Sequence, residues 1–432
     1  GAGCRTTAGF EHPPRGGGRR GLFASRRTHD IPLRYRRGRI VLRHVVVIGA
    51  GFGGLKAVEE LHARDPRLAL TLIAPEPTFL YWPSFVWVPS GRRDPDELSV
   101  DVRDWLDAHG AAYHRGHVRA VRDGGRLVET DQGTLTNDGL VVASGGRALT
   151  TAPGEAHTLS ICAGAAAALA IRDRLRGLDG GHLAFGVAGN PEHRPAMRAG
   201  ALLELVFAVD RQLREKNRRA RFRLALFSPE AEVGARPGDR GVERLLARLE
   251  RLGVDLHLGG RIERFEVDRV VTSRGEIASD LTVFMPGLTG PDWLAASELP
   301  VTASGHVAVD ARARVDGLQR VYAVGDSAAF PGPRWQAKQA HTAELQAETA
   351  AANLVRELHG GAPERTVRHE VINILDDLDT AAFVFRDDRG ELMLPPNPLA
   401  HYLKLGLEAK ALRKYGPLRR PPRRLQPAGA GA

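Results

Sequence analysis

The sequence predicts an α/β fold with two doubly wound parallel sheets, followed by a C-terminal α+β tail. Three observations lead to this fold class. Buried, β-branched strands alternate with amphipathic helices along most of the 432 residues. A complete G-x-G-x-x-G turn follows the first of these strands. A second series of strand, turn and helix begins near residue 180.

The first block begins with a buried β-branched run, Val45–Ile48, which is typical of a central parallel strand. A helix is expected over about residues 53–63, and a second strand over residues 68–76. Residues 126–146 indicate a short antiparallel segment followed by another buried strand, Leu140–Ala143. This order of strand, helix and strand is typical of a βαβ unit.

The second block repeats this alternation. Its expected elements are a strand and turn at 180–190, an amphipathic helix at 201–220, a strand at 221–230, a helix, strand and hairpin at 241–276, and a buried strand at 280–288. A buried strand at 321–326 and a long helix at 341–361, closed by Gly360, come next. The last ordered elements are a strand at 369–375 and a helix at 399–415.

These elements predict two Rossmann-like dinucleotide-binding domains, of which the first is discontinuous. The expected segments are a disordered Arg-rich leader at 1–42, the first domain at 43–150 and 295–362, the second domain at 151–294, a C-terminal segment at 363–415 and a disordered basic tail at 416–432.

The net charge of +10 belongs to the two ends of the chain. Residues 1–42 carry +8 and residues 410–432 carry +7, so residues 43–409 carry −5. A folded nucleic-acid-binding domain would carry its positive charge on the body, so no nucleic-acid partner is expected. The basic ends suit a solvated arm or an anionic lipid surface; arginine bias in a GC-rich genome is the alternative.

The two cysteines, Cys4 and Cys162, lie far apart, which excludes a disulfide framework. No cluster of His, Cys and carboxylate residues has metal-binding spacing, so no metal is expected. The longest apolar candidate, residues 161–171, is too short and Ala-rich to span a bilayer, and the leader lacks the apolar core of a secretory signal. We therefore expect a cytoplasmic protein, whose basic ends also suit peripheral contact with the inner membrane.

The first glycine turn contains Gly49, Gly51 and Gly54, with a further glycine at Gly53. The first permits a tight turn, the second lets the backbone approach a pyrophosphate, and the third lets helix and strand pack closely. The phosphate then lies at a helix N-terminus, which favours anions. Glu76 follows the second strand, about 22 residues beyond Gly54, where a carboxylate can accept a hydrogen bond from a ribose hydroxyl.

Two later segments indicate which dinucleotide binds. Residues 140–146 (LVVASGG) and 321–330 (VYAVGDSAAF) resemble the second and third FAD signatures of flavoproteins with two dinucleotide-binding domains. The resemblance implies FAD as the cofactor. It places Ser144, in the position of a usual Thr, and Gly145 at the cofactor, together with the Gly325–Asp326 step, whose Asp hydrogen-bonds the ribityl chain in that family.

The second glycine turn, in the sequence AFGVAGNPEHRPAMRAG, is incomplete. Gly186 and Gly189 are present, but the third glycine is missing and Pro191 and Pro195 interrupt the expected helix start. The second domain is therefore expected to be a degenerate NAD-type domain, which disfavours NAD(P)H as the electron donor.

Four further segments resemble sulfide:quinone oxidoreductases. They are the aromatic stretch at 70–91, the "SIC" segment at 159–171, the segment with a long helix at 333–354, and the C-terminal helix at 399–415. The resemblance covers roughly residues 43–415. The wider group of FAD-dependent pyridine nucleotide-disulfide oxidoreductases includes flavocytochrome c sulfide dehydrogenases and type II NADH dehydrogenases.

This resemblance implies roles for particular residues. Cys162 matches a redox cysteine and Lys338 lies in the segment over the flavin, so both are candidate catalytic residues, and the C-terminal helix faces the membrane. Trp82, Phe85 and Trp87 are either walls of a quinone pocket or ordinary core aromatics.

One of the family's two redox cysteines is missing. The second should fall near Val371, Ile372 and Asn373, and the residue nearest in alignment, Ile372, is redox-inert. Cys162 itself either forms a reactive thiolate, whose pKa is lowered by a helix N-terminus, or is a small buried residue beside an Ala-rich helix.

The sequence thus predicts an FAD-dependent oxidoreductase. By resemblance, it passes two electrons from a small donor, sulfide or another sulfur species, through FAD to a membrane quinone. One alternative is an NAD(P)H:quinone oxidoreductase of the type II NADH dehydrogenase kind. Another is a non-catalytic protein that binds flavin as a sensor. The oligomeric state stays open.

Overall fold

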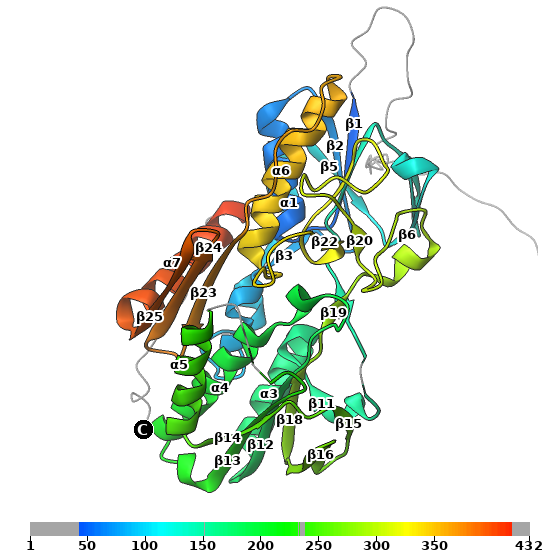
Figure 1. The fold of residues 1–432 in the computed structure, drawn as a ribbon. Coiled ribbons are helices and arrows are strands. Elements are labelled where there is room, and N and C mark those ends of the chain that lie inside the picture. The colour runs from blue at the N-terminus through cyan, green and yellow to red at the C-terminus, as the bar shows by residue number, and fades with distance from the viewer. Residues whose placement is uncertain (1–42, 151, 232, 234–237, 417–432) are drawn as a thin grey trace, which may run out of the picture. The chain divides into compact units, whose positions relative to one another are not determined.

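The computed structural model describes residues 43–416, apart from residues 151, 232 and 234–237 (Figure 1). The expected disordered leader at 1–42 and the basic tail from residue 417 onward lie outside the described residues. In the described part, two five-stranded parallel sheets are each packed against helices. The predicted α/β fold class is confirmed.

The first sheet has the strand order β21-β9-β1-β2-β5, and all of its strands are parallel. The bounds are β1 His44–Ile48, β2 Ala69–Ala74, β5 Ala111–Arg115, β9 Gly139–Val142 and β21 Val321–Ala323. Val46 pairs with Thr71 on one side and with Leu140 on the other. Because β1 is central and covered on both faces, its sequence is continuously apolar rather than alternating.

Two helices lie side by side against this sheet (Figure 1). They are α1, Phe52–Arg64, and α6, Ala340–Leu358. Both bury small and apolar side chains, including Ala57 and Leu61 of α1 and Ala347 and Leu354 of α6. The two segments that supply this sheet and its helices are thus separated in sequence by the second sheet, as a discontinuous domain requires.

The second sheet has the order β11-β18-β12-β13-β14 and is also parallel. Its strands are β11 Thr158–Leu159, β12 Gly181–Val187, β13 Phe222–Ser228, β14 Val254–Leu258 and β18 Leu281–Met285, and its helices are α3 Ala165–Gly177, α4 Ala199–Glu215 and α5 Asp239–Arg251. A core of apolar side chains from these elements fills the space between sheet and helices.

Short elements connect and cover these sheets. The strands are β3 Thr78–Leu80, β4 Ser99–Asp101, β6 Val118–Arg122, β7 Leu127–Thr130, β8 Gly133–Thr136, β10 Arg147–Ala148, β15 Ile262–Phe265, β16 Arg269–Thr272, β17 Gly275–Ala278, β19 Leu288–Thr289, β20 Val307–Ala308 and β22 Ala328–Ala329. The helix α2 spans Arg103–Ala108, and the 3₁₀ turns used below are η1 Trp82–Trp87, η5 Ile161–Ala163, η6 Arg194–Ala196 and η9 Gly325–Ser327.

The C-terminal part is an antiparallel sheet, β23 Glu370–Asp376, β24 Ala381–Asp387 and β25 Gly390–Asn397, followed by the helix α7, Pro398–Tyr415. The sequence predicted the first strand and the helix, but not the hairpin of β24 and β25. Within the described residues, no helix combines the length and the apolar character needed to cross a membrane.

The helix α7 reverses the usual arrangement of a surface helix, in which apolar side chains are buried and charged ones are exposed. It buries His401, Lys404 and Glu408, while four large apolar side chains are exposed. These exposed residues, which we call the α7 apolar face, are Leu399, Tyr402, Leu403 and Leu407. Leu405, Ala409 and Leu412 of the same helix are half-buried.

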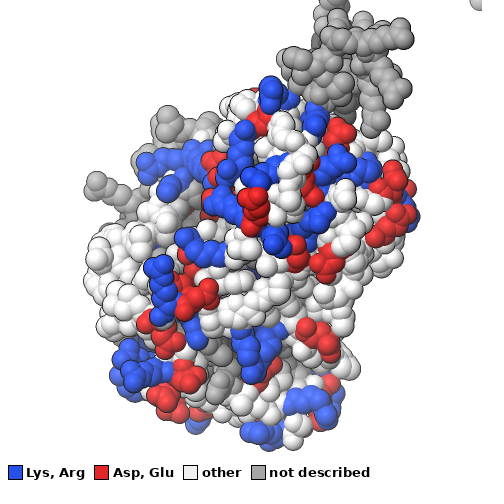
Figure 2. All heavy atoms as spheres, turned by 45° about the horizontal axis from the view of Figure 1, so that its top comes forward, with Lys and Arg blue, Asp and Glu red and all other residues white. Residues whose placement is uncertain are grey.

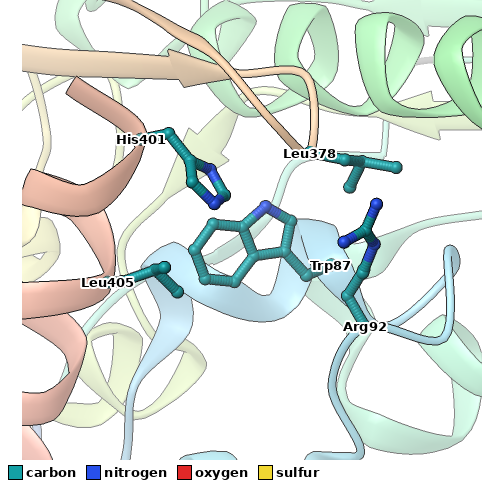
Figure 3. A pocket seen from close by; sticks show the side chains of 5 residues that line it. All are labelled: Trp87, Arg92, Leu378, His401 and Leu405. Carbon is teal, nitrogen blue, oxygen red and sulfur yellow. The ribbon is translucent and has the colours of Figure 1, made fainter. Parts of the chain in front are cut away.

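Buried polar contacts hold α7 in this orientation. Lys404 pairs with Glu204 of α4, and Arg93 pairs with Glu408 at 2.8 Å. His401 contacts Asp376 of β23 at 2.6 Å. Trp87 lies among these groups, as Figure 3 shows, with His401 and Leu405 on one side and Leu378 and Arg92 on the other; the recess between them has no room for a water molecule.

Candidate active site

The glycine turn after β1 has the geometry that a dinucleotide requires. Gly49 has a φ of +109°, and a Cβ there would lie 2.3 Å from the carbonyl oxygen of Ala143. A Cβ on Gly54 would lie 1.8 Å from the Gly49 carbonyl oxygen, so α1 packs directly against the turn. By contrast, a Cβ on Gly51 would meet nothing within 4 Å. The backbone at Gly51 is therefore open to a ligand, and Gly51 begins α1 without a side-chain cap.

The loops after β9 and β21 lie next to this turn, because their strands are neighbours in the sheet. The Ser144 hydroxyl oxygen is buried and has no hydrogen-bond partner. Gly145 has a φ of +78° and open space where a Cβ would be. A Cβ on Gly146 would lie 3.2 Å from the Asp326 carbonyl oxygen, which brings the two loops into contact.

Lys338 is held beneath the Gly325–Asp326 step. Its ammonium donates to the carbonyl oxygen of Ala328 at 2.6 Å and to those of Gly325 and Asp326 at 3.2 and 3.3 Å. Burial lowers the pKa of Lys338 to about 8, and the nearby Asp326 charge opposes this effect. Lys338 therefore still carries its positive charge at neutral pH.

Glu76 lies at the carboxyl end of β2, as its predicted role requires, but it is exposed and pairs with Arg115 at 2.5 Å. An exposed ion pair of this kind contributes little to stability, so Arg115 does not prevent Glu76 from accepting a ribose hydroxyl.

These residues fit FAD. The strands β1, β9 and β21 are adjacent and parallel, so the loops that follow them lie at one edge of the sheet. These loops contain Gly49–Gly54, Ser144–Gly145 and Gly325–Asp326. The open backbone at Gly51 suits a pyrophosphate, and the unpartnered Ser144 hydroxyl is a donor that a bound cofactor would satisfy.

Cys162 lies in η5, three residues before α3 begins. Its backbone N–H donates to the Ser160 hydroxyl at 3.4 Å. Burial raises the pKa of the Cys162 thiol; the charge of Arg198 opposes this effect and that of Asp326 adds to it. The expectation of a lowered thiol pKa is therefore wrong, because Cys162 precedes the helix instead of capping it, and desolvation disfavours the thiolate.

The N-terminal ends of α4 and α6 lie close together near Cys162. The backbone N–H of Lys338 donates to the Pro195 carbonyl at 3.4 Å. Gln339, the N-cap of α6, donates to the side-chain oxygen of Asn373. That oxygen would lie 3.5 Å from a Cβ on Gly200, in the first turn of α4.

Asn373 is the residue of the expected second-cysteine region, Val371 to Asn373, for which contacts with the starts of α4 and α6 are seen. Side chains alternate along β23, so Asn373 and Ile372 point to opposite faces. Asn373 contacts Gln339 through its side-chain oxygen and lies against Gly200 at the start of α4. A polar, redox-inert amide therefore occupies the side of β23 that faces the start of both helices.

Two histidines, His193 and His306, are paired within the range of the Lys338 charge. The rings of His193 and His306 are 4.9 Å apart between centroids, and His306 Nδ1 is 2.8 Å from the Ser304 hydroxyl. Burial lowers the pKa of His193 to about 4 and that of His306 to about 3, and the charge of Lys338 contributes to both shifts. Both imidazoles are neutral at pH 7. Nothing in the sequence spacing of these two histidines indicates that they form a pair.

The second glycine turn is long. Between β12 and α4 the chain forms η6, and α4 begins only at Ala199. Glu230 follows β13, and one of its carboxylate oxygens would lie 3.8 Å from a Cβ on Gly189. A carboxylate is thus present after the second strand of this sheet, while the direct strand-to-helix turn is not.

Two other regions are distinct from this site. Trp87 is buried and donates to Asp376 at 3.1 Å, so it belongs to the core. Trp82 is 42 % exposed and lies against Phe85, with the two rings tilted and their centroids 4.7 Å apart. A polar pocket of about 370 Å³ beside Arg320 and Glu357 lies at the opposite end of the strands.

On the face shown in Figure 2, positive and negative side chains are interspersed. In the described ranges, no three His, Cys, Asp or Glu residues are grouped so that they could hold a metal ion.

Comparisons with known proteins agree with this geometry. The pyridine nucleotide-disulphide oxidoreductase family model matches residues 43–179 and 233–347. Sulfide-quinone reductase of Aquifex aeolicus is 26 % identical over 85 % of this chain and 89 % of its own. The type II NADH:quinone oxidoreductase Ndh of Mycobacterium tuberculosis is 28 % identical over 72 % of this chain and 74 % of its own.

A solved structure shows the same fold. The sulfide:quinone oxidoreductase of Aquifex aeolicus superposes with a TM-score of 0.79 at 23 % identity, covering 86 % of this chain and 91 % of that one. The family match covers more than half of the chain, and the glycine turn, Ser144 and Asp326 fit the cofactor. The chain therefore belongs to the pyridine nucleotide-disulphide oxidoreductase family and is an FAD-dependent oxidoreductase.

Proposed function

We propose that this protein takes two electrons from sulfide, or from another small sulfur species, and passes them through FAD to a membrane quinone. The observation that carries the proposal is the convergence of the glycine turn, Ser144 and the Gly325–Asp326 step at one edge of the first sheet, with Lys338 bonded to the carbonyl oxygens of that step. The similarity to sulfide-quinone reductase over 85 % of the chain supports both the donor and the acceptor.

In this proposal FAD accepts the electrons, and the protein residues stabilise the charge that develops. FAD, when bound, accepts the electron pair that leaves hydrosulfide as it becomes sulfane sulfur and a proton. Lys338 keeps a positive charge beneath the Gly325–Asp326 step, which stabilises negative charge that develops on the cofactor side. The N-terminal ends of α4 and α6 add positive potential in the same region.

Cys162 serves in this proposal as a neutral thiol at the donor site. Burial keeps it protonated, so it contributes a polarisable sulfur and no negative charge. Asn373 does not supply a second sulfur. We therefore expect slow oxidation of sulfide compared with an enzyme that uses two thiols.

The α7 apolar face is proposed to contact the membrane in which the quinone dissolves. Leu399 is 78 % and Tyr402 is 67 % exposed, and basic side chains follow at Lys410 and Arg413. An apolar face next to cationic groups binds an anionic bilayer surface. The variant Leu403→Glu should lose binding to anionic vesicles in a flotation assay, whereas Thr134→Glu, an exposed position on β8, should bind normally.

The test is the visible spectrum of the anaerobic flavin before and after addition of sulfide. We expect sulfide to bleach the flavin, and Cys162→Ala to bleach about tenfold more slowly, because loss of the thiol at the donor site should raise the activation free energy by about 1.4 kcal/mol. Equal rates in the two proteins would remove Cys162 from the mechanism. A flavin that ignores sulfide, NADH and other donors would support the non-catalytic alternative.

NADH:quinone oxidoreduction is a second candidate, favoured by the position of Glu230 near Gly189. A carboxylate after the second strand can hold the adenosine ribose even where the glycine turn is incomplete. Bleaching by NADH and not by sulfide would establish this function in place of the first.

A further inference from the structure

A polar pocket lies at the end of the first sheet that is opposite to the FAD-binding loops. Those loops follow β1 and β21, whereas Arg43 and Arg320 immediately precede the same two strands. The last turn of α6 forms another wall. The pocket has a volume of about 370 Å³, and its lining includes Arg43, Arg314, Gln319, Arg320, Glu357 and Leu358. It is therefore a cavity separate from the candidate active site.

The backbone of Arg320 is held in an unusual conformation. Its φ is +55°, in the left-handed region that a residue with a Cβ rarely adopts. Its N–H donates to the Glu357 carboxylate at 3.0 Å, and its carbonyl oxygen accepts from the Leu140 N–H at 2.9 Å and from Arg126 Nη2 at 3.1 Å. The Arg320 guanidinium, by contrast, has no hydrogen bond or ion pair with the described residues. Residues in such conformations are concentrated at functional sites.

Glu357 is the single carboxylate among the described residues that line the pocket, and both of its oxygens are already bonded. Its Oε1 pairs with Arg314 Nη2 at 3.1 Å. Its Oε2 accepts from the Tyr322 hydroxyl at 2.6 Å and from the Arg320 N–H. The Glu357 side chain is only 9 % exposed, so it is largely buried against these partners. Glu357 therefore does not neutralise the guanidinium groups of Arg43 and Arg320.

Two guanidinium groups at this end of the sheet have buried donors without an acceptor. Arg314 pairs with Glu357 through Nη2, but its Nε is buried and has no hydrogen-bond partner. Arg126 donates through Nη2 to the carbonyl oxygens of Gln319 and Arg320, and its Nη1 is likewise buried without a partner. Because buried donors are normally hydrogen-bonded, this region is short of acceptors.

The charged groups in and around the pocket leave it positive. Three arginines and one glutamate line it, which gives the lining a charge of +2. Next to them, Arg126 adds one positive charge, while Asp123 and Asp138 add one negative charge each. Asp310 and Asp65 are each paired with an arginine and add no net charge. The C-terminal end of α6 contributes about half a negative charge, which does not cancel the excess.

We propose that this pocket binds inorganic diphosphate, with the guanidinium groups of Arg43, Arg314 and Arg320 in contact with its oxygens. Guanidinium N–H groups match phosphate oxygens in pairs, and three such groups favour an anion with several charges. The volume exceeds that of a single phosphate group. Leu358 is the one large apolar side chain of the described lining, so the pocket offers little surface to a nucleobase. This binding site is independent of the proposed electron transfer.

The test is calorimetric titration of the flavin-loaded full chain with inorganic pyrophosphate in a phosphate-free buffer. We expect a dissociation constant below about 1 mM. Arg320→Gln should raise this constant about tenfold, because a charged contact is lost, and Arg320→Lys should raise it about threefold, because the charge stays but the fork is lost. Gln319→Glu should raise it at least about tenfold, because it adds a carboxylate to the lining.

Arg244→Gln is the matched control, because Arg244 is an exposed arginine of α5 without an ion pair among the described residues. It should leave the dissociation constant unchanged. Thermal unfolding gives a second readout, in which pyrophosphate should raise the midpoint of the parent and of Arg244→Gln more than that of Arg320→Gln. The flavin absorbance should stay constant during the titration, which shows that pyrophosphate does not displace FAD.

Three results would overturn the inference. The first is a parent protein that gives no binding heat with pyrophosphate. The second is binding that both Arg320→Gln and Gln319→Glu leave unchanged, since the anion would then lie elsewhere. The third is equally tight binding of sulfate at the same ionic strength, which would show a general attraction of anions and no site for diphosphate.

Discussion

Asp376 connects three elements, and its removal should release α7 from the body. Its carboxylate accepts hydrogen bonds from Trp87 Nε1 at 3.1 Å, from the Leu378 backbone N–H at 2.8 Å and from His401 Nδ1 at 2.6 Å. The side chain is fully buried. The variant Asp376→Ala therefore leaves donors of η1, of the turn between β23 and β24, and of α7 without an acceptor in a region that excludes water.

The expected cost follows from these three contacts. A buried donor that loses its acceptor costs about 1–3 kcal/mol. This penalty applies to the Trp87 donor and to the Leu378 donor, and loss of the His401 contact adds about 1 kcal/mol, so Asp376→Ala should destabilise the protein by about 3–7 kcal/mol. Asp376→Asn keeps an acceptor oxygen for two donors and should cost about 1–2 kcal/mol.

The Asp376 carboxylate should also make the stability of the protein depend on pH in the acid range. Burial alone would raise the pKa of Asp376, but the His401 hydrogen bond and the Lys404 charge hold it below its usual value. Because the folded pKa is depressed, this stabilisation is present above the unfolded pKa near 4 and is lost as the pH falls through the folded pKa. Stability in acid should therefore fall more steeply in the parent protein than in Asp376→Ala.

The assay is urea unfolding, with hydrogen exchange of the α7 amides as the local readout. Asp388→Ala, an exposed position in the β24–β25 hairpin, is the control and should stay within about 0.5 kcal/mol of the parent. If Asp376→Ala were as stable as this control, with α7 equally protected, the buried network would not be what holds α7 in place.

Three further results are expected. Gly49→Ala should yield protein without visible flavin absorbance, because a Cβ there would clash with the Ala143 carbonyl at a φ of +109°, whereas Gly390→Ala should retain its flavin; equal flavin contents would contradict the role of the turn. Lys338→Met should slow sulfide-driven flavin reduction about a hundredfold. In the parent protein the rate should decline above about pH 8, where the Lys338 ammonium loses its proton, and this decline should be absent in Lys338→Met. Stopped-flow rates from pH 6 to about 10 check this, and a parent rate that is constant across that range would refute it. Asn373→Cys should speed bleaching by sulfide about tenfold, whereas Ile372→Cys, on the opposite face of β23, should not; similar effects of the two would show that Asn373 does not face the donor site.

Local patterns in the sequence were sufficient for the fold class and for one half of the candidate site. The β-branched run at Val45–Ile48 and the spacing of Gly49, Gly51 and Gly54 are requirements of a few adjacent residues on backbone geometry. Such requirements can be recognised in the sequence, because the residues that satisfy them are neighbours in the chain. The FAD signatures at 140–146 and 321–330 belong to the same class, since each is a strand followed by its own turn.

Only the tertiary structure decided the donor side and the orientation of α7. Pro195, Gln339 and Asn373 belong to three separate segments, and nothing in their spacing shows that contacts join these segments. The sign of the Cys162 pKa shift depends on burial by distant segments, which outweighs any helix end nearby. The outward apolar face of α7 likewise depends on Glu204 and Asp376, which lie far away in sequence and pair with the charges that the helix buries.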